Sequence, residues 1–325
     1  MKLPRRRFLH LAAGAAALPA VSAFAWAQAY PSRPVRIVVG FGSGSAFDIL
    51  ARLTGQWLSD RLGQPFVIEN RGGAGGNLGT ETVVRAPADG YTLLLCGSPD
   101  AINATLFDKL SFNFLRDIAP VAAIARGPNV LVVHPSFPAK TVPEFIAYAK
   151  ANPGKIDFAS AGVGSVSHMA GELFKAMAGV NLVHVPYRGL APAITDLLGG
   201  QVQTIFSTMP PAIAQIKAGK LRALAVTSAT RSEALPDLPT IGAVLPGYEA
   251  IQVAALGAPR NTPAVIVERL NKEINAALAD PGFKGRLADL GNEPMPMTIA
   301  GFGQFMVDET EKWAKVVKFS GAKPD

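Results

Sequence analysis

Three glycine- and serine-rich segments lie where an apolar run typical of a β-strand gives way to helical spacing. They cover residues 40–48 (GFGSGSAFD), 70–79 (NRGGAGGNLG) and 160–168 (SAGVGSVSH). Glycine permits the sharp backbone turns and the close approach of a ligand that such a junction requires. The first N–H groups of the following helix point outward without partners, with the positive end of the helix dipole behind them. Together the three segments predict a site for a small anionic ligand, to which serine hydroxyls add further donors.

Strand-like and helix-like segments alternate along the chain, which predicts an α/β fold with parallel sheets covered by helices on both faces. Residues 35–41 have the pattern of a buried strand, and residues 49–62 have helical spacing. In open sheets of this kind ligands bind at the carboxyl ends of the strands, where the three turns are expected. Further strands are expected at residues 66–69, 91–96, 121–124, 130–133, 156–159, 182–185, 202–206, 221–227 and 251–256, and further helices at residues 79–85, 142–151, 168–178, 191–198, 211–218, 264–279 and 299–317.

The domain boundaries must come from the order of these elements, because no long linker rich in proline and glycine divides the chain. We expect a discontinuous first domain, formed by residues 30–127 and 248–325, with residues 128–247 inserted as a second domain. The chain would then cross between the domains twice, near residues 126–128 and 245–247. Two crossings form a natural hinge, about which a bound ligand can draw two lobes together.

Residues 1–29 have the pattern of a bacterial export signal. Arginines at positions 5–7 precede Phe8 and Leu9, as in the twin-arginine type of signal, and an alanine-rich apolar run with small-residue cleavage registers follows. The alternatives are the general export route and a retained anchor. The apolar run contains Pro19 and is shorter than the roughly 20 residues of a membrane span. We therefore expect export to the periplasm and cleavage of this segment.

The charge balance argues against a nucleic-acid partner. Residues 1–29 carry four basic side chains and no acidic one, which leaves 27 basic and 24 acidic side chains in the remainder. A net charge of +3 on nearly 300 residues is typical of an ordinary soluble surface. No basic run with interleaved aromatic residues occurs, as a nucleic-acid surface would need.

Several motifs then occur in a specific order. Asp48 is followed by Ala51 and Arg52, and the second and third glycine-rich segments come next. Further along the chain are residues 184–192 (HVPYRGLAP), 196–202 (DLLGGQV), 219–226 (GKLRALAV) and 235–240 (LPDLPT).

From about residue 30 to the C-terminus, the order and spacing of these motifs resemble the extracytoplasmic solute receptors of tripartite tricarboxylate transporters, also called Bug receptors. The resemblance implies a two-lobed periplasmic binding protein-like (type II) fold, with a ligand cleft between two α/β domains. It also implies that the receptor closes on a small organic carboxylate and delivers it to a membrane permease of the tripartite tricarboxylate type.

The resemblance further implies that backbone amides and small hydroxyl side chains of the first two turns hold the carboxylate, helped by water. The inserted domain would contribute residues around Ser165, and Tyr187 could close over the ligand. Ser98, directly after the strand at residues 91–96, is a further candidate donor, and no arginine clamp is expected. The residues expected to contact the ligand are Ser43, Gly44, Ser45, Ala46, Phe47, Asp48, Gly73, Ala74, Gly75, Gly76, Asn77, Ser98, Gly164, Ser165, Ser167, His168 and Tyr187.

The first turn departs from the family pattern, which starts with proline and phenylalanine and has a pair of glycines before the aspartate. Here Gly40 stands at the proline position, and Ser45 replaces the second glycine. Ser45 restricts any left-handed backbone conformation at that point. Phe47, directly before Asp48, either packs in the core, as most bulky apolar residues do, or faces the cleft and favours a ligand with an apolar or aromatic body.

Three other residues have a structural interpretation beside a functional one. His168 is expected to cap or pack at its helix start, with ligand contact as the less favoured alternative. Asp48 lies at a helix N-terminus, where the dipole stabilises a carboxylate, but it could also bind an amino group of the ligand. Cys96 is the only cysteine and lies in an apolar run, which favours a buried small hydrophobe over a reactive thiol.

Other functions match the motifs less well. The first turn lacks the third glycine of a dinucleotide fingerprint, and no Gly-x-Ser-x-Gly elbow supports a secreted serine hydrolase. His168 and His184 could share a metal, but no close pair of histidines or cysteines supports them. We expect a monomer without cofactor, metal or catalytic activity. An orphan receptor, which senses or scavenges carboxylates without a cognate permease, is the main alternative.

Overall fold

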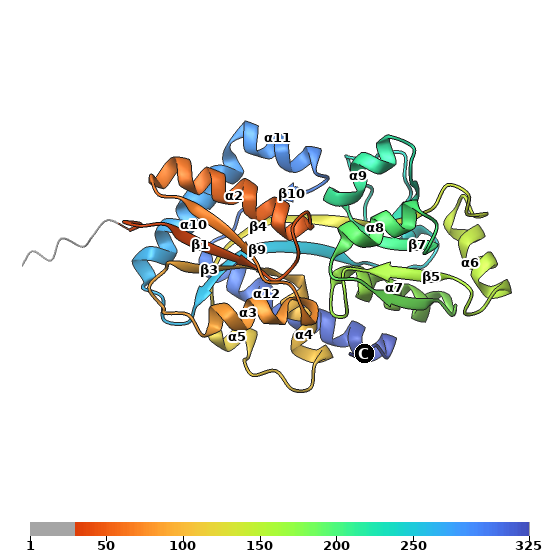
Figure 1. Ribbon diagram of the computed structural model, residues 1–325, viewed down its shortest axis with the longest axis horizontal. Helices are drawn as coiled ribbons and strands as arrows, with labels where there is room; N and C mark the ends of the chain where they lie inside the picture. Colours follow the sequence, from red (N-terminus) through yellow and green to blue (C-terminus); the bar gives the residue numbers. More distant parts are fainter. Residues whose placement is uncertain (1–29, 325) are drawn as a thin grey trace, which may run out of the picture. The chain divides into compact units, whose positions relative to one another are not determined.

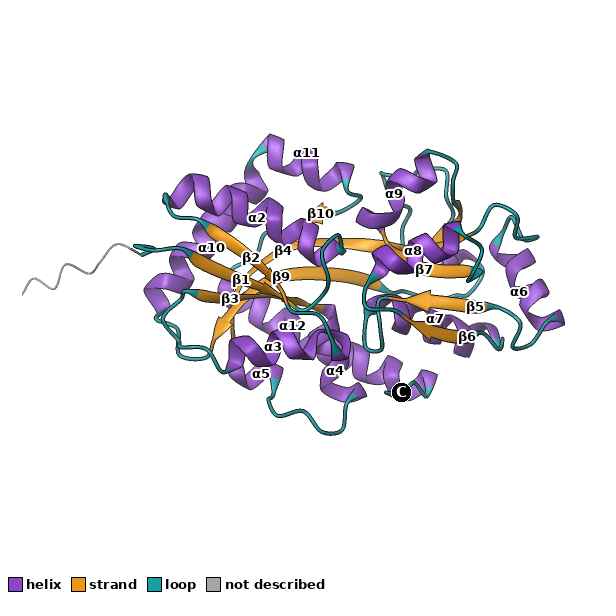
Figure 2. Ribbon diagram, in the orientation of Figure 1, coloured by secondary structure: helices purple, strands orange, loops and turns teal. Residues whose placement is uncertain are grey.

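The computed structural model describes residues 30–324, so the export signal expected in residues 1–29 lies outside the described residues. From Arg33 onward the chain forms one compact α/β unit (Figure 1). Figure 2 shows strands running through its interior with helices on both sides. The strands hydrogen-bond in the order β2-β1-β3-β9-β4-β7-β5-β6, and β8 and β10 pair with β4. These strands are β1 (Val35–Val39), β2 (Phe66–Asn70), β3 (Thr92–Gly97), β4 (Ile118–Val133), β5 (Asp157–Ser160), β6 (Val183–Pro186), β7 (Thr204–Thr208), β8 (Arg222–Val226), β9 (Ile251–Pro259) and β10 (Glu293–Pro294).

The three glycine-rich turns lead from strands into helices, as the sequence predicts. In the first and third turns the hydroxyls of Ser45 and Ser165 accept hydrogen bonds from the N–H groups of Asp48 and His168, a cap that serine favours. The second turn first forms a short 3-10 helix, and its α-helix begins at Asn77, earlier than predicted. The α-helices are α2 (Ala46–Leu62), α3 (Asn77–Val84), α4 (Ser98–Leu106), α5 (Phe114–Asp117), α6 (Val142–Ala151), α7 (Val166–Ala178), α8 (Leu190–Leu198), α9 (Met209–Lys217), α10 (Ala264–Ala279), α11 (Pro281–Asp289) and α12 (Ile299–Ser320).

The helices α4, α5 and α11 are absent from the sequence prediction. In α4 the cause is local, because Ser98, Pro99 and Asp100 directly follow a strand and have the composition of a turn. Pro99 instead fits the first helical turn, where its missing N–H group leaves no hydrogen bond unmade. The carboxylate of Asp100 accepts a hydrogen bond from Gly97 N at 2.9 Å, which caps the helix.

The sheet is mixed, whereas the alternation of elements predicts parallel sheets. β1 pairs in parallel with β2 and β3, and β5 pairs in parallel with β6 and β7. In the middle of the sheet, β9 is antiparallel to β3 and β4, and β4 is antiparallel to β7 and β8. Alternation alone does not specify the direction in which a strand returns to the sheet, which is why the prediction is wrong there.

A single long strand, β4, replaces the two strands predicted at residues 121–124 and 130–133. The sequence between them contains Gly127 and Pro128, which indicated a break. In the structure Pro128 lies opposite Ile251 at the end of the β9 pairing, and Asn129 begins the pairing with β7. A proline cannot donate a hydrogen bond to a neighbouring strand, so it suits the point where β4 changes partners.

Thr227 links Asn129 and Ala250, which follow the two chain segments that are expected to form the hinge. Its hydroxyl accepts a hydrogen bond from Asn129 N at 2.7 Å and lies 2.6 Å from Ala250 O. Its backbone N–H donates to Asn129 O, and its carbonyl accepts from Ala250 N, both at 2.9 Å. The domain boundaries remain a prediction, but the residues that follow both connecting segments are joined by this buried threonine.

Replacing Thr227 with valine is expected to destabilise the protein by about 2 kcal/mol. Valine keeps the shape but removes the hydroxyl, which leaves the buried N–H of Asn129 and the carbonyl of Ala250 without this partner. Urea unfolding measures the difference. In the control T82V, the lost bond from Thr82 to Leu78 O is exposed, so the change should stay within about 0.5 kcal/mol. Equal effects of T227V and T82V would contradict this role for Thr227.

The buried interior contains Cys96, as predicted. It is 1 % exposed, and burial raises the pKa of its thiol well above the ordinary value. Both observations fit a small core residue. Among residues 30–324, no helix combines the length and the apolar character needed to cross a lipid bilayer.

Candidate ligand-binding site

The three glycine-rich turns meet around two adjoining cavities. The large cavity, of about 400 Å³, is lined mainly by the second and third turns. The small cavity, of about 20 Å³, is lined by the starts of α2 and α7 together with β7 and β9. Phe41 and Ala161 line both cavities, so the two cavities share this part of their wall. The large cavity is lined by Gly40, Phe41, Gly72, Gly73, Ala74, Gly75, Gly76, Phe107, Ala161, Gly162, Val163, Tyr187, Arg188 and Pro324, and the small cavity by Phe41, Ser45, Ala46, Phe47, Pro99, Ala161, Ser165, Val166, Ser167, Leu190, Thr208 and Gln252.

A third cavity, of about 440 Å³, lies elsewhere. It is formed around residues 126–128 and 228–234 and contains side chains of both charges, and none of its lining residues comes from the three turns. We place the candidate site at the turns because unpartnered hydrogen-bond donors gather there, as described next.

The second turn has the strongest anion-binding geometry. Among the described residues, the N–H groups of Gly72, Gly73, Ala74 and Gly75 have no hydrogen-bond partner. All four residues line the large cavity. Three of them, and the following Gly76, have positive φ values, including Ala74 at 48°. Successive N–H groups in such a concave backbone attract a carboxylate or a similar anion.

The first turn is less available than the sequence predicts. Gly44 N donates to the carboxylate of Asp48 at 2.9 Å, and Ser43 Oγ lies 3.4 Å from the same oxygen. Asp48 also forms an ion pair with Arg52 at 2.9 Å. Burial acts to raise the pKa of Asp48, but the bonds from Arg52 and Gly44 outweigh it and the pKa is lowered. Asp48 therefore stabilises its own turn, and neither Ser43, Gly44 nor Asp48 lines a cavity. The first turn contributes Ser45, Ala46 and Phe47 to the small cavity.

The hydroxyls of the third turn are also engaged internally. Ser165 Oγ donates to Gly162 O at 2.6 Å, and Ser167 Oγ accepts from Ala161 N at 2.9 Å. Ser165 and Ser167 still line the small cavity, whereas Gly164 lines neither. The serine hydroxyls of the third turn therefore hold the turn in a fixed shape beside the cavity and are not free donors.

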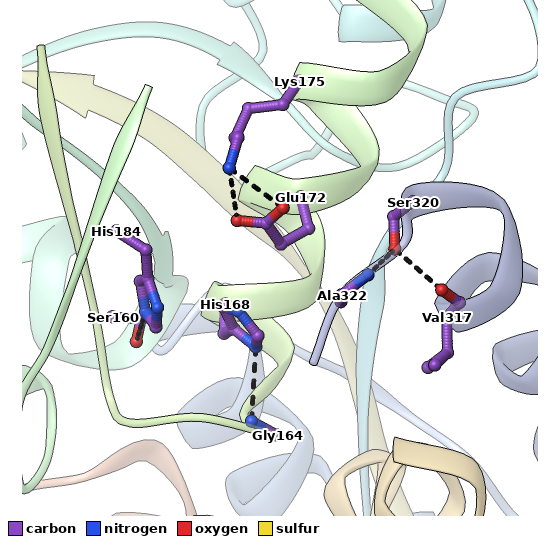
Figure 3. Close-up of polar contacts among 9 residues, drawn as sticks. All are labelled: Ser160, Gly164, His168, Glu172, Lys175, His184, Val317, Ser320 and Ala322. Atoms are coloured by element: carbon purple, nitrogen blue, oxygen red, sulfur yellow. Dashed lines mark hydrogen bonds and ion pairs between the residues drawn. The ribbon is translucent and has the colours of Figure 1, made fainter. Parts of the chain in front are cut away.

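His168 has the structural role that the sequence favours. It is 3 % exposed, and its Nδ1 accepts a hydrogen bond from Gly164 N at 3.3 Å (Figure 3). Its ring stacks on His184 at 4.2 Å between centroids. Burial, together with the nearby His184 and Lys175, lowers the pKa of His168 to about 3. His168 is therefore neutral near pH 7, lines neither cavity, and belongs to no metal-binding cluster within residues 30–324.

Aromatic residues form much of the wall. Phe47 is 5 % exposed, stacks on Phe41 at 5.3 Å and lines the small cavity, so it is both buried and at the site. Tyr187 lines the large cavity, but its hydroxyl donates to Asp196 at 2.6 Å. Burial and this hydrogen bond raise the pKa of Tyr187 to about 12.

Two further predicted residues lie away from the cavities. Ser98 is buried, and its hydroxyl accepts a hydrogen bond from Val253 N at 2.9 Å, so it links α4 to β9. Asn77 is held by Asn103, whose Nδ2 donates to Asn77 Oδ1 at 3.1 Å and to Gly75 O at 3.0 Å. Both residues support the turns and line neither cavity.

Sequence reasoning missed several lining residues. Arg188 lines the large cavity, although no arginine was expected there. Its position directly after Tyr187, a predicted ligand contact, could have indicated that it lies at the site. Thr208 and Gln252 line the small cavity. Thr208 ends a strand and precedes a helix, as the three turns do, but without the glycines that drew attention to them.

The second and third turns approach each other closely. A Cβ atom placed on Gly75 would lie 2.3 Å from Val163 O, and one placed on Gly164 would lie 2.0 Å from Asn103 Oδ1. At the large cavity, Gly75 therefore lies against the backbone of the third turn with no room for a side chain, and Gly164 is packed equally tightly against Asn103 of α4.

Comparison with known proteins gives concordant results. A sequence profile described as "Tripartite tricarboxylate transporter family receptor" matches residues 50–321. Protein BugT of Bordetella pertussis is 38 % identical over 300 residues, which cover 91 % of this chain and 92 % of that protein. The structure of R. palustris Rpa4515 with adipate has a TM-score of 0.88 and 38 % identity, and covers 91 % of this chain and 100 % of that one. MatC (Rpa3494) from Rhodopseudomonas palustris with bound malate has a TM-score of 0.85 and 34 % identity, with coverage of 89 % and 100 %.

Proposed function

Since the chain belongs to the tripartite tricarboxylate transporter receptor family, we propose that it captures a small organic carboxylate in the periplasm and delivers it to a membrane permease of the tripartite tricarboxylate type. The observation that carries this proposal is the run of unpartnered N–H groups from Gly72 to Gly75 at a cavity of about 400 Å³. Backbone amides in this arrangement bind an anion without a metal or a charged clamp.

Binding proceeds by exchange of hydrogen bonds. The carboxylate replaces water on the amides of the second turn, and the exposed Arg188 at the same cavity adds long-range attraction. The third turn and Tyr187 then enclose the ligand from the other side. Enclosure raises the population of the closed form, which the permease recognises, and no bond is made or broken.

The aromatic wall narrows the class of ligand. Phe41 and Phe107 line the large cavity, and Phe41 and Phe47 line the small one. Among the similar structures, one holds adipate and another holds malate. Adipate has a longer hydrocarbon chain than malate and lacks its hydroxyl group, so the apolar wall favours a ligand more like adipate. We therefore propose a carboxylate with an aliphatic or aromatic body. We further propose that residues 1–29 direct export and are removed, and that the exported protein is a monomer.

A thermal-shift screen tests the proposal. The protein is partly unfolded and refolded to release any retained ligand, and is then melted with a panel of small carboxylates. At a concentration of about 100 times Kd, a ligand that binds only the native state adds about 2.7 kcal/mol of stability, which raises the Tm by several degrees. The matching amides and methyl esters serve as controls and should give no shift. Hydrolysis of the esters without any carboxylate shift would reject the receptor and favour an enzyme.

A further inference from the structure

Thr208 presents a buried hydroxyl that the protein itself does not use. It is the last residue of β7, directly before α9, and it is 5 % exposed. Its Oγ1 has no hydrogen-bond partner within the described part of the chain. A buried hydroxyl without a partner destabilises the folded state, so its presence at a cavity points to a ligand.

The local sequence explains why this hydroxyl is unpaired. At a helix start, a serine or threonine hydroxyl normally accepts a hydrogen bond from the N–H of the second or third helical residue. Ser45 and Ser165 do so at the starts of α2 and α7, which also line the small cavity. In α9 these two positions are Pro210 and Pro211, which have no N–H group. The Met-Pro-Pro start of the helix therefore leaves the Thr208 hydroxyl free to donate elsewhere.

Gln252 lies on the same small cavity. It is 3 % exposed, and no hydrogen bond from its side-chain amide occurs within residues 30–324. The other hydroxyls there, those of Ser45, Ser165 and Ser167, have partners in their own turns. The remaining wall is apolar and includes Phe41 and Phe47. Thr208 and Gln252 are thus the polar side chains of this cavity with unused hydrogen-bonding capacity.

From this geometry we infer that Thr208, with Gln252, binds an acceptor oxygen at the far end of the ligand and so determines selectivity. The inference rests on the proposed function, in which the amides of Gly72 to Gly75 hold the first carboxylate. The small cavity adjoins the large one across Phe41 and Ala161, and about 20 Å³ is room for one oxygen-sized group. The ligand class is a carboxylate with an apolar body and a second terminal acceptor, such as an α,ω-dicarboxylate.

An alkanoate of the same length would place a methyl group beside Thr208. The hydroxyl would then stay buried without a partner, and a site built around a hydrogen bond rejects an analogue that lacks the matching group. The wild-type protein should therefore prefer the dicarboxylate to the alkanoate.

Calorimetric titration of the full chain with two matched series tests the inference. The probes are straight-chain α,ω-dicarboxylates of four to eight carbons and the n-alkanoates of equal length. Thr208→Val should weaken binding of the preferred dicarboxylate at least tenfold and change alkanoate binding less than threefold. Thr208→Ser, which keeps the hydroxyl, should stay within threefold of the wild type for both series.

The melting temperature of the ligand-free variant provides a second readout. Removing an unpaired buried hydroxyl should leave the Tm of Thr208→Val unchanged or raise it. A lower Tm would show that the hydroxyl bonds internally, for example to Asn129 Oδ1, which lies on the paired strand and is also without a partner, and would overturn the inference.

The remaining outcomes separate this inference from the proposed function. Equal losses for dicarboxylates and alkanoates, or no loss for either, would overturn the role of Thr208 while the receptor function stands. A wild-type protein that prefers alkanoates would do the same. A wild-type protein that binds no carboxylate would overturn both.

Discussion

Replacing Gly75 with alanine is expected to weaken carboxylate binding at least 100-fold, which corresponds to about 2.8 kcal/mol. The new Cβ would lie 2.3 Å from Val163 O, a backbone atom of the third turn, which cannot move by itself. The methyl group would hold the second and third turns apart and shift the free amides that line the large cavity. Titration with the best carboxylate from the thermal-shift screen measures the loss.

Gly63 provides the matched control. Gly75 and Gly63 have φ values of 64° and 73°, so alanine costs each position about 1–2 kcal/mol of backbone strain. A Cβ on Gly63, however, has no atom within 4 Å. The G63A variant should lose stability but keep its affinity, whereas G75A should lose both. Equal affinities of the two variants would show that the close approach of the turns does not matter for binding.

The local part of this site could be predicted from the sequence. The glycine pattern of the second turn identified the chain segment whose amides are free. The same reasoning identified Ser45 and Ser165 as ligand contacts, and both line the small cavity, although the structure also shows them capping their own helices. These features depend on residues within a few positions of each other, which a linear sequence displays directly.

The parts that were missed depend on distant contacts or on an interaction that competes with the ligand. Thr208 reaches the site only because β7 pairs with the far end of β4, and the pattern predicted two short strands where β4 is one. In the first turn, the sequence pattern predicted that Gly44 N donates to the ligand, but in the structure this N–H group donates to the carboxylate of Asp48. Gly44 and Asp48 lie only four residues apart at the start of a helix, so this competition could have been predicted from the sequence.

His168 explains an expected loss of stability in acid. Its pKa is about 3 in the folded protein, because of burial and the neighbouring His184 and Lys175, against about 6.5 for a free histidine. Below about pH 6.5 the unfolded chain binds a proton at this residue and the folded protein does not, so protonation favours unfolding. The contribution of neutral His168 to the free energy of unfolding is fully present above pH 6.5, and about 3 kcal/mol of it should be lost at pH 4.

Asp100 has the opposite effect on stability as the pH falls. Burial raises its pKa to about 6, although hydrogen bonds from Thr80 and Gly97 counteract this. Between about pH 4 and pH 6 the folded protein therefore holds this proton more tightly than the unfolded chain, which stabilises the fold as the pH falls. A pH profile of the parent protein alone mixes the two effects, so the His168 contribution has to be measured as a difference between variants.

The variant H168N isolates that contribution. Asparagine can still accept the hydrogen bond from Gly164 N, but it does not titrate. At pH 8 the variant should be less stable than the parent, because it loses the ring stacked on His184. As the pH falls from 8 to 4, the unfolding free energy of H168N, measured in urea relative to the parent, should rise by about 3 kcal/mol, which reduces or reverses this deficit. Parallel curves for H168N and the parent would show that His168 does not resist protonation in the folded protein.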